Sequence, residues 1–268
     1  MSEAIDISSE SLGALRAAQP ERDVLLLDVR QPKEYLAGHI PGALSAPLIP
    51  LLDGEVPLEP TLHVVCYCAT GHRSRLAAVN LARRLEAQVY NLVGGIVAWR
   101  GGVVRDAPRA TALDAAAGAV SDLLRRAIAL EKGAHVLYTA MGPFFAGPAR
   151  DALDGLAAAE IRHARLLHRV LRRSTRAQTS FEDDLARAGG TTLESGAPLS
   201  EALEGAGAGR VGLLELAVAM ELGAHDLYRH LARRLEAADL RRALLYLAAE
   251  ERGHAETLLD LLERESGA

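Results

Sequence analysis

The stretch "HVVCYCATGHRSRLAAVNLARRLE" (residues 63–86) sets the fold of the first part of the chain. Its first six residues form a continuous apolar run of strand length, which is typical of a strand covered on both faces. Helical spacing follows over 72–86, and two further strands are predicted at "VLLLDV" (24–29) and "QVYNLV" (88–93). A strand–helix–strand order implies a right-handed crossover and a parallel sheet. The sequence therefore predicts an α/β domain over residues 1–106.

Both cysteines of the chain lie in this stretch, and their positions predict one reactive thiol. Cys68 falls between strand and helix, where loop N–H groups and the positive end of the helix favour a thiolate. Arg73 adds a fixed charge that can also hold an anionic substrate. Cys66 lies deeper on the same strand face and is expected to pack as a small apolar group. Two cysteines exclude a disulfide framework and a four-cysteine metal site.

The composition describes an ordinary soluble protein with room for two domains. The chain has 268 residues, of which 49% are hydrophobic and 24% charged, and its net charge is −5. So mild a charge argues against a broad nucleic-acid surface. The N-terminal residues lack an apolar segment of signal-peptide length, and no later run is long enough to cross a bilayer. We therefore expect a cytoplasmic protein without nucleic-acid or membrane partners.

Residues 1 to about 105 resemble the rhodanese family of sulfurtransferases. Three segments carry the resemblance: "LLLDVRQPKEYLAGHIPGALSAP" (25–47), "VVCYCATGHRSRLAA" (64–78) and "VYNLVGGIVAWRGG" (89–102). The resemblance implies an α/β fold around a central parallel sheet, with Cys68 as a sulfur carrier that alternates between thiolate and persulfide. The loop from Cys68 to Arg73 has six residues, the length of sulfurtransferases and one shorter than in the related phosphatases.

The resemblance also assigns roles to residues around the thiol. Arg73 and Asp28 are the catalytic partners that it implies, and Asp28 would support the active-site loop. The expected substrate-binding loop consists of Ala69, Thr70, Gly71 and His72. Structural hydrogen bonding is the alternative for Asp28 and Glu34, and His72 either tunes the thiolate or faces water. The sulfur donor and acceptor stay open among thiosulfate, glutathione persulfide and protein persulfides.

Strand signals end near residue 106, and helical periodicity takes over. A linker is expected at 107–112, followed by an all-α four-helix bundle over 113–268. The helices are predicted at 112–141, 149–173, 210–236 and 239–265, with a long crossover at about 174–209.

The bundle sequence repeats itself. "AIALEKGAHVLYTA" (127–140) aligns with "AVAMELGAHDLYRH" (217–230), and "AAEIRHARLL" (158–167) aligns with "AEERGHAETLL" (249–259). The repeat predicts two helical hairpins of similar design that face each other.

Each second block contains Glu-x-x-His, which places the Glu and His on one helical face. Each first block contains a Glu among apolar residues, and a lone carboxylate is costly to bury. Four carboxylates and two imidazoles that converge in a bundle need a pair of divalent cations among them. Oxygen and imidazole ligands suit Fe or Mn, and less specifically Zn. The candidate ligands are Glu131, Glu160, His163, Glu221, Glu251 and His254.

This arrangement resembles the di-iron centre of ferritin-like bundles, and residues 113–268 look closest to rubrerythrin. The resemblance implies Glu131 and Glu221 as terminal ligands, Glu160 and Glu251 as bridges, and one His for each iron. Ala224 stands where that family has a further carboxylate. The four-cysteine iron module of rubrerythrin is absent, so an external electron donor is expected.

Two further pairs of residues follow Glu131 and Glu221 on the same helices. His135 and His225 come four positions later, and Tyr138 and Tyr228 come seven positions later. Hydrogen bonds that support the metal ligands and a simple packing role stay open for all four. Direct ligation of the metal and a surface position are further alternatives for the two histidines. Bundles of this type often pair or exchange helices, so a homodimer is expected.

The leading hypothesis is an enzyme with two sites. Cys68 would carry sulfane sulfur, and a di-iron centre would react with O2 or peroxide. The alternative is a metal-storing or metal-sensing bundle whose rhodanese-like domain relays sulfur or serves as an interaction module.

Overall fold

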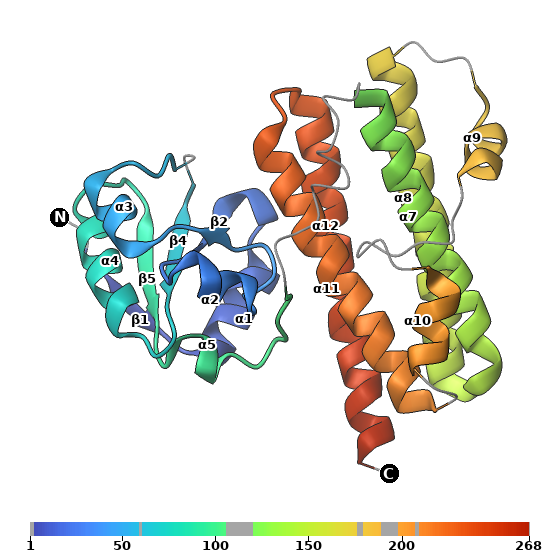
Figure 1. The fold of residues 1–268 in the computed structure, drawn as a ribbon, viewed down its shortest axis with the longest axis horizontal. Helices are drawn as coiled ribbons and strands as arrows, with labels where there is room; N and C mark the ends of the chain where they lie inside the picture. Colours follow the sequence, from blue (N-terminus) through green and yellow to red (C-terminus); the bar gives the residue numbers. More distant parts are fainter. Residues whose placement is uncertain are drawn as a thin grey trace. The chain divides into compact units, whose positions relative to one another are not determined.

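The computed structural model describes residues 3–58, 61–105, 120–175, 179–188, 198–206 and 209–267. The chain divides into two compact units, Met1–Ala107 and Pro108–Ala268 (Figure 1). The expected linker at 107–112 and the expected start of the first long helix at 112 lie outside the described residues.

The first unit is built on a parallel sheet of five strands in the order β1-β5-β4-β2-β3. The strands are β1 (Ile5–Ile7), β2 (Val24–Asp28), β3 (Leu44–Ser45), β4 (His63–Tyr67) and β5 (Gln88–Leu92). The three predicted strands form the centre of this sheet. The edge strands β1 and β3 were not predicted, because three and two residues carry too little periodicity to be recognised.

Helices cover both faces of the sheet. They are α1 (Ser9–Ala18), α2 (Pro32–Leu36), α3 (Leu48–Asp53), α4 (His72–Ala82) and α5 (Gly95–Ala98), with the 3-10 turn η1 (Glu21–Asp23). All five residues of β2 are buried and alternate between two cores: Leu25 and Leu27 join one, and Val24 and Leu26 join the other. The continuous apolar run of β2 is therefore explained by cover on both faces.

The prediction of a helix over 72–86 was too long at its C-terminal end. The helix α4 ends at Ala82, and Arg83 forms a turn whose N–H bonds to the carbonyls of Asn80 and Leu81. The chain needs this turn because β5 begins at Gln88, only a few residues later.

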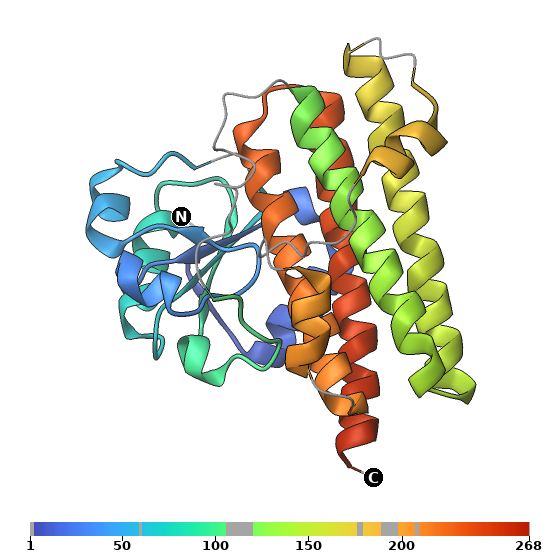
Figure 2. The same cartoon turned by 45° about the vertical axis from the view of Figure 1, so that its right-hand side comes forward.

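The second unit consists of two antiparallel helical hairpins, coloured green to yellow and orange to red in Figures 1 and 2. The long helices are α7 (Val120–Met141), α8 (Gly147–Thr175), α11 (Arg210–Arg234) and α12 (Ala238–Ser266). The short segments are η2 (Gly142–Phe144), α9 (Phe181–Arg187) and α10 (Leu199–Ala206). Every predicted end that the structure describes lies within two residues of the observed one. The fold class, an α/β unit followed by long packed helices, is confirmed.

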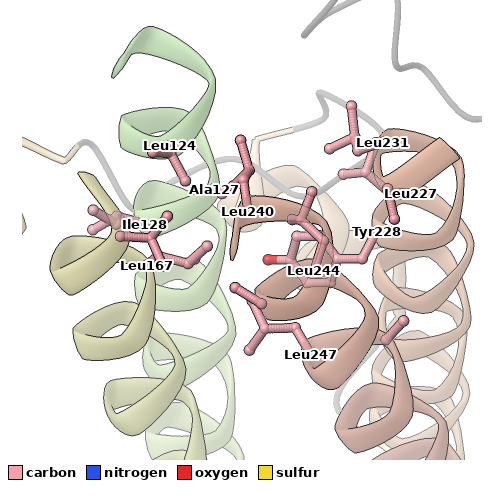
Figure 3. Packing of buried hydrophobic residues seen from close by; sticks show 14 of the residues in the cluster. Leu124, Ala127, Ile128, Leu167, Leu227, Tyr228, Leu231, Leu240, Leu244 and Leu247 are labelled. Atoms are coloured by element: carbon pink, nitrogen blue, oxygen red, sulfur yellow. The ribbon is translucent and has the colours of Figure 1, made fainter. Parts of the chain in front are cut away.

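An apolar core joins the two hairpins (Figure 3). Leu124 and Ile128 of α7 and Leu167 of α8 are fully buried on one side, and Leu244 and Leu247 of α12 are fully buried on the other. Among the helices of the described residues, none combines the length and the apolar composition that a bilayer span requires.

Buried polar contacts fix the crossover helix α9 to the bundle. Asp184 accepts a hydrogen bond from Thr179 at 2.8 Å and lies 3.1 Å from Nδ1 of His168 on α8. Lys132 of α7 donates to the carbonyl oxygens of Leu185 and Ala188 at 2.9 and 2.8 Å. These contacts satisfy groups that would be costly to bury alone.

Candidate thiol and metal sites

Cys68 lies at the end of β4, in the loop that leads into α4. The backbone N–H of Gly71 donates to its Sγ at 3.1 Å, and the hydroxyl of Ser74 lies 3.5 Å from the same sulfur. Gly71 has a φ of +96°, and a Cβ at this position would stand 3.2 Å from the backbone nitrogen of Gly94. Only glycine combines this backbone angle with such a close approach, so Gly71 shapes the cradle around the sulfur.

The two thiols of the chain differ in their acidity. Burial opposes ionisation of Cys68, but hydrogen bonds from Ser74 and from the loop N–H groups outweigh it and lower the pKa of this thiol. Burial raises the pKa of Cys66 to about 12. Cys66 therefore remains a neutral packing group, and the thiolate form is favoured at Cys68.

This difference predicts selective alkylation of the native protein. At about pH 7, iodoacetamide should modify Cys68 at least tenfold faster than Cys66, because the thiolate is the nucleophile. The rate should fall as the pH is lowered through the depressed pKa of Cys68. Peptide mapping by mass spectrometry after timed quenching measures both sites in one sample. Equal labelling of the two cysteines in folded protein would contradict the assignment.

Arg73, which was expected to hold an anionic substrate, also has a structural contact. Its guanidinium makes two hydrogen bonds of 2.8 Å to the carboxylate of Glu34, one to each oxygen. The bond from Arg73 lowers the pKa of Glu34 to about 2. The bidentate pair connects the end of the loop to α2, so Arg73 helps to position the loop.

The other predicted loop partners have structural contacts. Asp28 is fully buried and forms an ion pair with Arg30, with Nη2 and Oδ2 2.6 Å apart. Arg30 also donates to the carbonyl of Gly38 at 2.6 Å, which fits the structural alternative for Asp28. His72 is exposed and lies 3.1 Å from the hydroxyl of Thr70, on the outer side of the loop.

A relay behind the sulfur was missed by sequence reasoning. The Ser74 oxygen lies 2.7 Å from Oδ1 of Asn91, so its single hydrogen can point either to this amide or to the sulfur, and Nδ2 of Asn91 donates to Asp6 at 2.8 Å. Asn91 is buried on β5, in register with Cys66 on β4. An amide next to apolar residues on a central strand was the available signal, since a buried amide needs partners.

The six predicted metal ligands come together inside the bundle. The repeat places one Glu on each of α7 and α11 and one Glu-x-x-His on each of α8 and α12. They form two groups whose ligand atoms lie within 4.8 Å of one another: Glu131, Glu160, His163 and Glu251, and Glu160, Glu221, Glu251 and His254. Glu160 and Glu251 belong to both groups, which is the position that bridging ligands take.

Both imidazoles direct Nδ1 at the carboxylates. Nδ1 of His163 lies 3.3 Å from Glu131, 3.3 Å from Glu160 and 3.1 Å from Glu251. Nδ1 of His254 lies 3.1 Å from Glu160, 3.6 Å from Glu221 and 3.1 Å from Glu251. The two rings are stacked with their centroids 5.3 Å apart.

The electrostatics of this cluster fit a site for cations. Burial and the nearby carboxylate of Glu160 raise the pKa of Glu131 to about 8, and burial among three carboxylates raises that of Glu251. Burial opposes protonation of His254, but the carboxylates around it raise its pKa to about 12. Buried oxygens of Glu160 and Glu251 and Nδ1 of both histidines have no hydrogen-bond partner of acceptable geometry. Buried oxygen and imidazole groups without hydrogen-bond partners are suited to bind a divalent metal ion.

Two tyrosines link the hairpins at this cluster. The hydroxyl of Tyr138 on α7 donates to Glu221 on α11, and that of Tyr228 on α11 donates to Glu131 on α7. Each tyrosine thus contacts the ligand of the opposite hairpin, and not the Glu seven residues before it. Both tyrosines are fully buried, so they orient the carboxylates as well as fill the core.

The two additional histidines lie outside the ligand groups found in the described residues. Nδ1 of His135 lies 2.8 Å from the carbonyl of Ala157, and Nδ1 of His225 lies 2.6 Å from the carbonyl of Ala248. Each contact joins the two helices of one hairpin, and the pair repeats the internal symmetry of the sequence.

Known proteins resemble both parts of the chain. The profile of the rhodanese-like domain matches residues 11–101, and that of rubrerythrin matches residues 212–268. A sulfurtransferase of Allochromatium vinosum is 46% identical over 96 residues, which cover 35% of this chain and 86% of that protein. Thiosulfate sulfurtransferase GlpE of Pseudoalteromonas translucida is 38% identical over 81 residues, which cover 30% and 75%. A rhodanese-like domain protein of Staphylococcus aureus matches in structure with 27% identity and a TM-score of 0.32, covering 36% of this chain and 91% of that one.

The rubrerythrin match includes α11 and α12, and with them Glu221, Glu251 and His254. The first hairpin lies outside it. The assignment of Glu131, Glu160 and His163 as candidate ligands rests instead on the internal repeat and on the convergence of the side chains.

Proposed function

Because this chain belongs to the rhodanese family through residues 11–101 and carries a rubrerythrin domain after them, we propose that it is a two-site enzyme of sulfur and oxidant chemistry. The observation that carries the first site is the Sγ of Cys68, held by the Gly71 N–H at 3.1 Å with a lowered pKa. This is the environment of a nucleophilic thiolate.

The proposed sulfur transfer has two steps. The thiolate of Cys68 attacks the sulfane sulfur of a donor such as thiosulfate, a new S–S bond forms, and sulfite leaves with the electron pair of the broken bond. The N–H groups of the loop then hold the negative charge of the outer sulfur. An acceptor nucleophile such as cyanide takes this sulfur as thiocyanate and returns the Cys68 thiolate.

The second site would hold two iron ions, with Mn or Zn as alternative metals. Glu131 and Glu221 would bind at the two ends, Glu160 and Glu251 between the ions, and one histidine on each. Two ferrous ions bound there would supply the two electrons that reduce peroxide to water, and an external donor would restore them. The buried residues themselves exclude water, and Tyr138 and Tyr228 fix the orientation of Glu221 and Glu131.

The test of the second site is the reaction of the ferrous protein with peroxide. Protein loaded anaerobically with Fe(II) and mixed with H2O2 in a stopped-flow instrument should be oxidised within seconds, at about one peroxide per two irons. The control is the same concentration of Fe(II) in buffer without protein. Stable iron binding without oxidation would support a bundle that stores or senses metal, and would contradict the proposed enzyme.

A further inference from the structure

A groove of about 910 Å³ lies between α8 and α12 of the bundle. Arg162, Arg165, Arg169 and Arg173 line it from α8, at spacings of three, four and four residues. This spacing places all four guanidiniums on one helical face. Arg242 and Tyr246 line the groove from α12. The groove is therefore strongly basic on the α8 wall, and the α12 wall carries an aromatic ring and the carboxylates of Asp239 and Glu250.

Most of the charge on this wall is not neutralised. Within the described residues, Arg162, Arg169 and Arg173 have no ion pair with a carboxylate. Arg165 lies over the ring of Phe181, 5.2 Å from its centroid, and Arg242 pairs with Asp239. A solvated helix usually alternates its charges, because like charges four residues apart destabilise it. A row of arginines on a concave surface instead provides a site for a ligand with several negative charges.

The lining indicates which class of anion would bind. Guanidinium groups bind phosphates in a bidentate manner, and a step of three to four residues separates them by roughly 5–6 Å along the helix. Tyr246 is 54% exposed, and Leu166 and Ala243 contribute apolar surface beside it. The volume matches that of a small-molecule site. A flat ring with attached phosphates, as in a nucleotide, satisfies the arginines, the tyrosine and the apolar surface together.

The inner end of the groove reaches the metal cluster. His163 lines the groove, and its Nε2 lies 3.8 Å from the Glu250 carboxylate, which lines it too. Nδ1 of the same ring faces the carboxylates of the cluster. A single imidazole ring therefore separates the groove from the proposed metal position.

We propose that this arginine-lined groove binds the phosphate and ring of a redox nucleotide, a flavin or a nicotinamide, beside His163. Only the role of this ligand as the external electron donor rests on the proposed function. Oxidation of one reduced flavin ring releases two electrons in single steps, the number that two ferric ions accept, and its protons pass to water. A dihydronicotinamide gives up the same two electrons as a hydride, so in this role it would need a flavin as the acceptor.

Binding to the full-length protein tests the groove directly. FMN is titrated against riboflavin, which has the same ring without the phosphate, and ligand fluorescence reports binding. FMN should bind at micromolar concentration, and riboflavin should bind at least tenfold more weakly. Arg169→Glu should weaken FMN binding at least tenfold. Arg172→Glu is the matched control, because Arg172 is exposed on the same helix but does not line the groove, and it should change binding less than twofold.

Further measurements separate this proposal from the proposed function. Tyr246→Ala should weaken the binding of FMN and leave the binding of inorganic pyrophosphate unchanged. The metal content of each variant is measured in the same samples. If FMN, NADPH and pyrophosphate all fail to bind, or if the two arginine variants have equal effects, the groove is not the proposed binding site. If FMN binds to protein that takes up no metal, the proposed nucleotide site stands and the proposed metal chemistry is rejected.

Discussion

Replacing Cys68 with serine is expected to reduce sulfur transfer from thiosulfate to cyanide by at least about 1,000-fold. The sulfur is the atom that forms and breaks the covalent bond, and a serine hydroxyl is not ionised near neutral pH. The serine oxygen keeps the hydrogen-bond donors of the loop, so the loss reports the nucleophile and not a collapsed loop. Thiocyanate formation measures the rate, and a mass increase of one sulfur atom after thiosulfate treatment measures the loaded intermediate.

Cys66→Ala is the matched control for this experiment. Cys66 is buried in the sheet core with Leu27 and Val64, and its pKa is raised, so its thiol should take no part. The variant should retain activity within about twofold, with a stability loss of about 1 kcal/mol from the lost packing. Loss of activity in folded Cys66→Ala, or full activity in Cys68→Ser, would reject the single-thiol mechanism.

The parts of the fold that the sequence predicted are those with local signals. The central strands are largely buried, with all five residues of β2, four of β4 and three of β5 inside, and the long helices repeat apolar positions over many turns. The ligand set was predictable because the chain contains the pattern twice, and a repeat reduces the chance of coincidence. Strands β1 and β3 had no such signal, since they exist only through pairing with β5 and β2.

The contacts that the sequence did not predict join positions far apart in the chain. Arg73 and Glu34 are 39 positions apart, and Tyr138 and Glu221 are 83 positions apart. Helical spacing places Tyr138 near the face of Glu131, but only the packing of the two hairpins decides which carboxylate it reaches. The row of arginines on α8 can be recognised in the sequence as exposed charge. It lines a groove only because α12 forms the opposite wall.

The two groups of metal ligands make different predictions for each glutamate. Glu160 belongs to both groups, so Glu160→Gln should abolish binding of both metal ions. Glu131 belongs to one group only, so Glu131→Gln should leave about one ion per chain, where we expect the unmodified protein to bind two. Glutamine keeps the size of the side chain but not its charge, so the loss reflects ligation and charge balance rather than a cavity. Elemental analysis after loading with Fe(II) or Mn(II) and removal of free metal gives the stoichiometry.

Glu256→Gln on α12 controls for a general effect of charge, because Glu256 is exposed and pairs with Arg252 away from the cluster. It should retain both ions. Removal of the shared Glu160 takes a ligand and a counter-charge from both groups at once, whereas removal of Glu131 takes them from one group. Equal, partial losses in Glu160→Gln and Glu131→Gln would mean that no carboxylate is shared. The centre would then be two independent sites rather than a bridged pair.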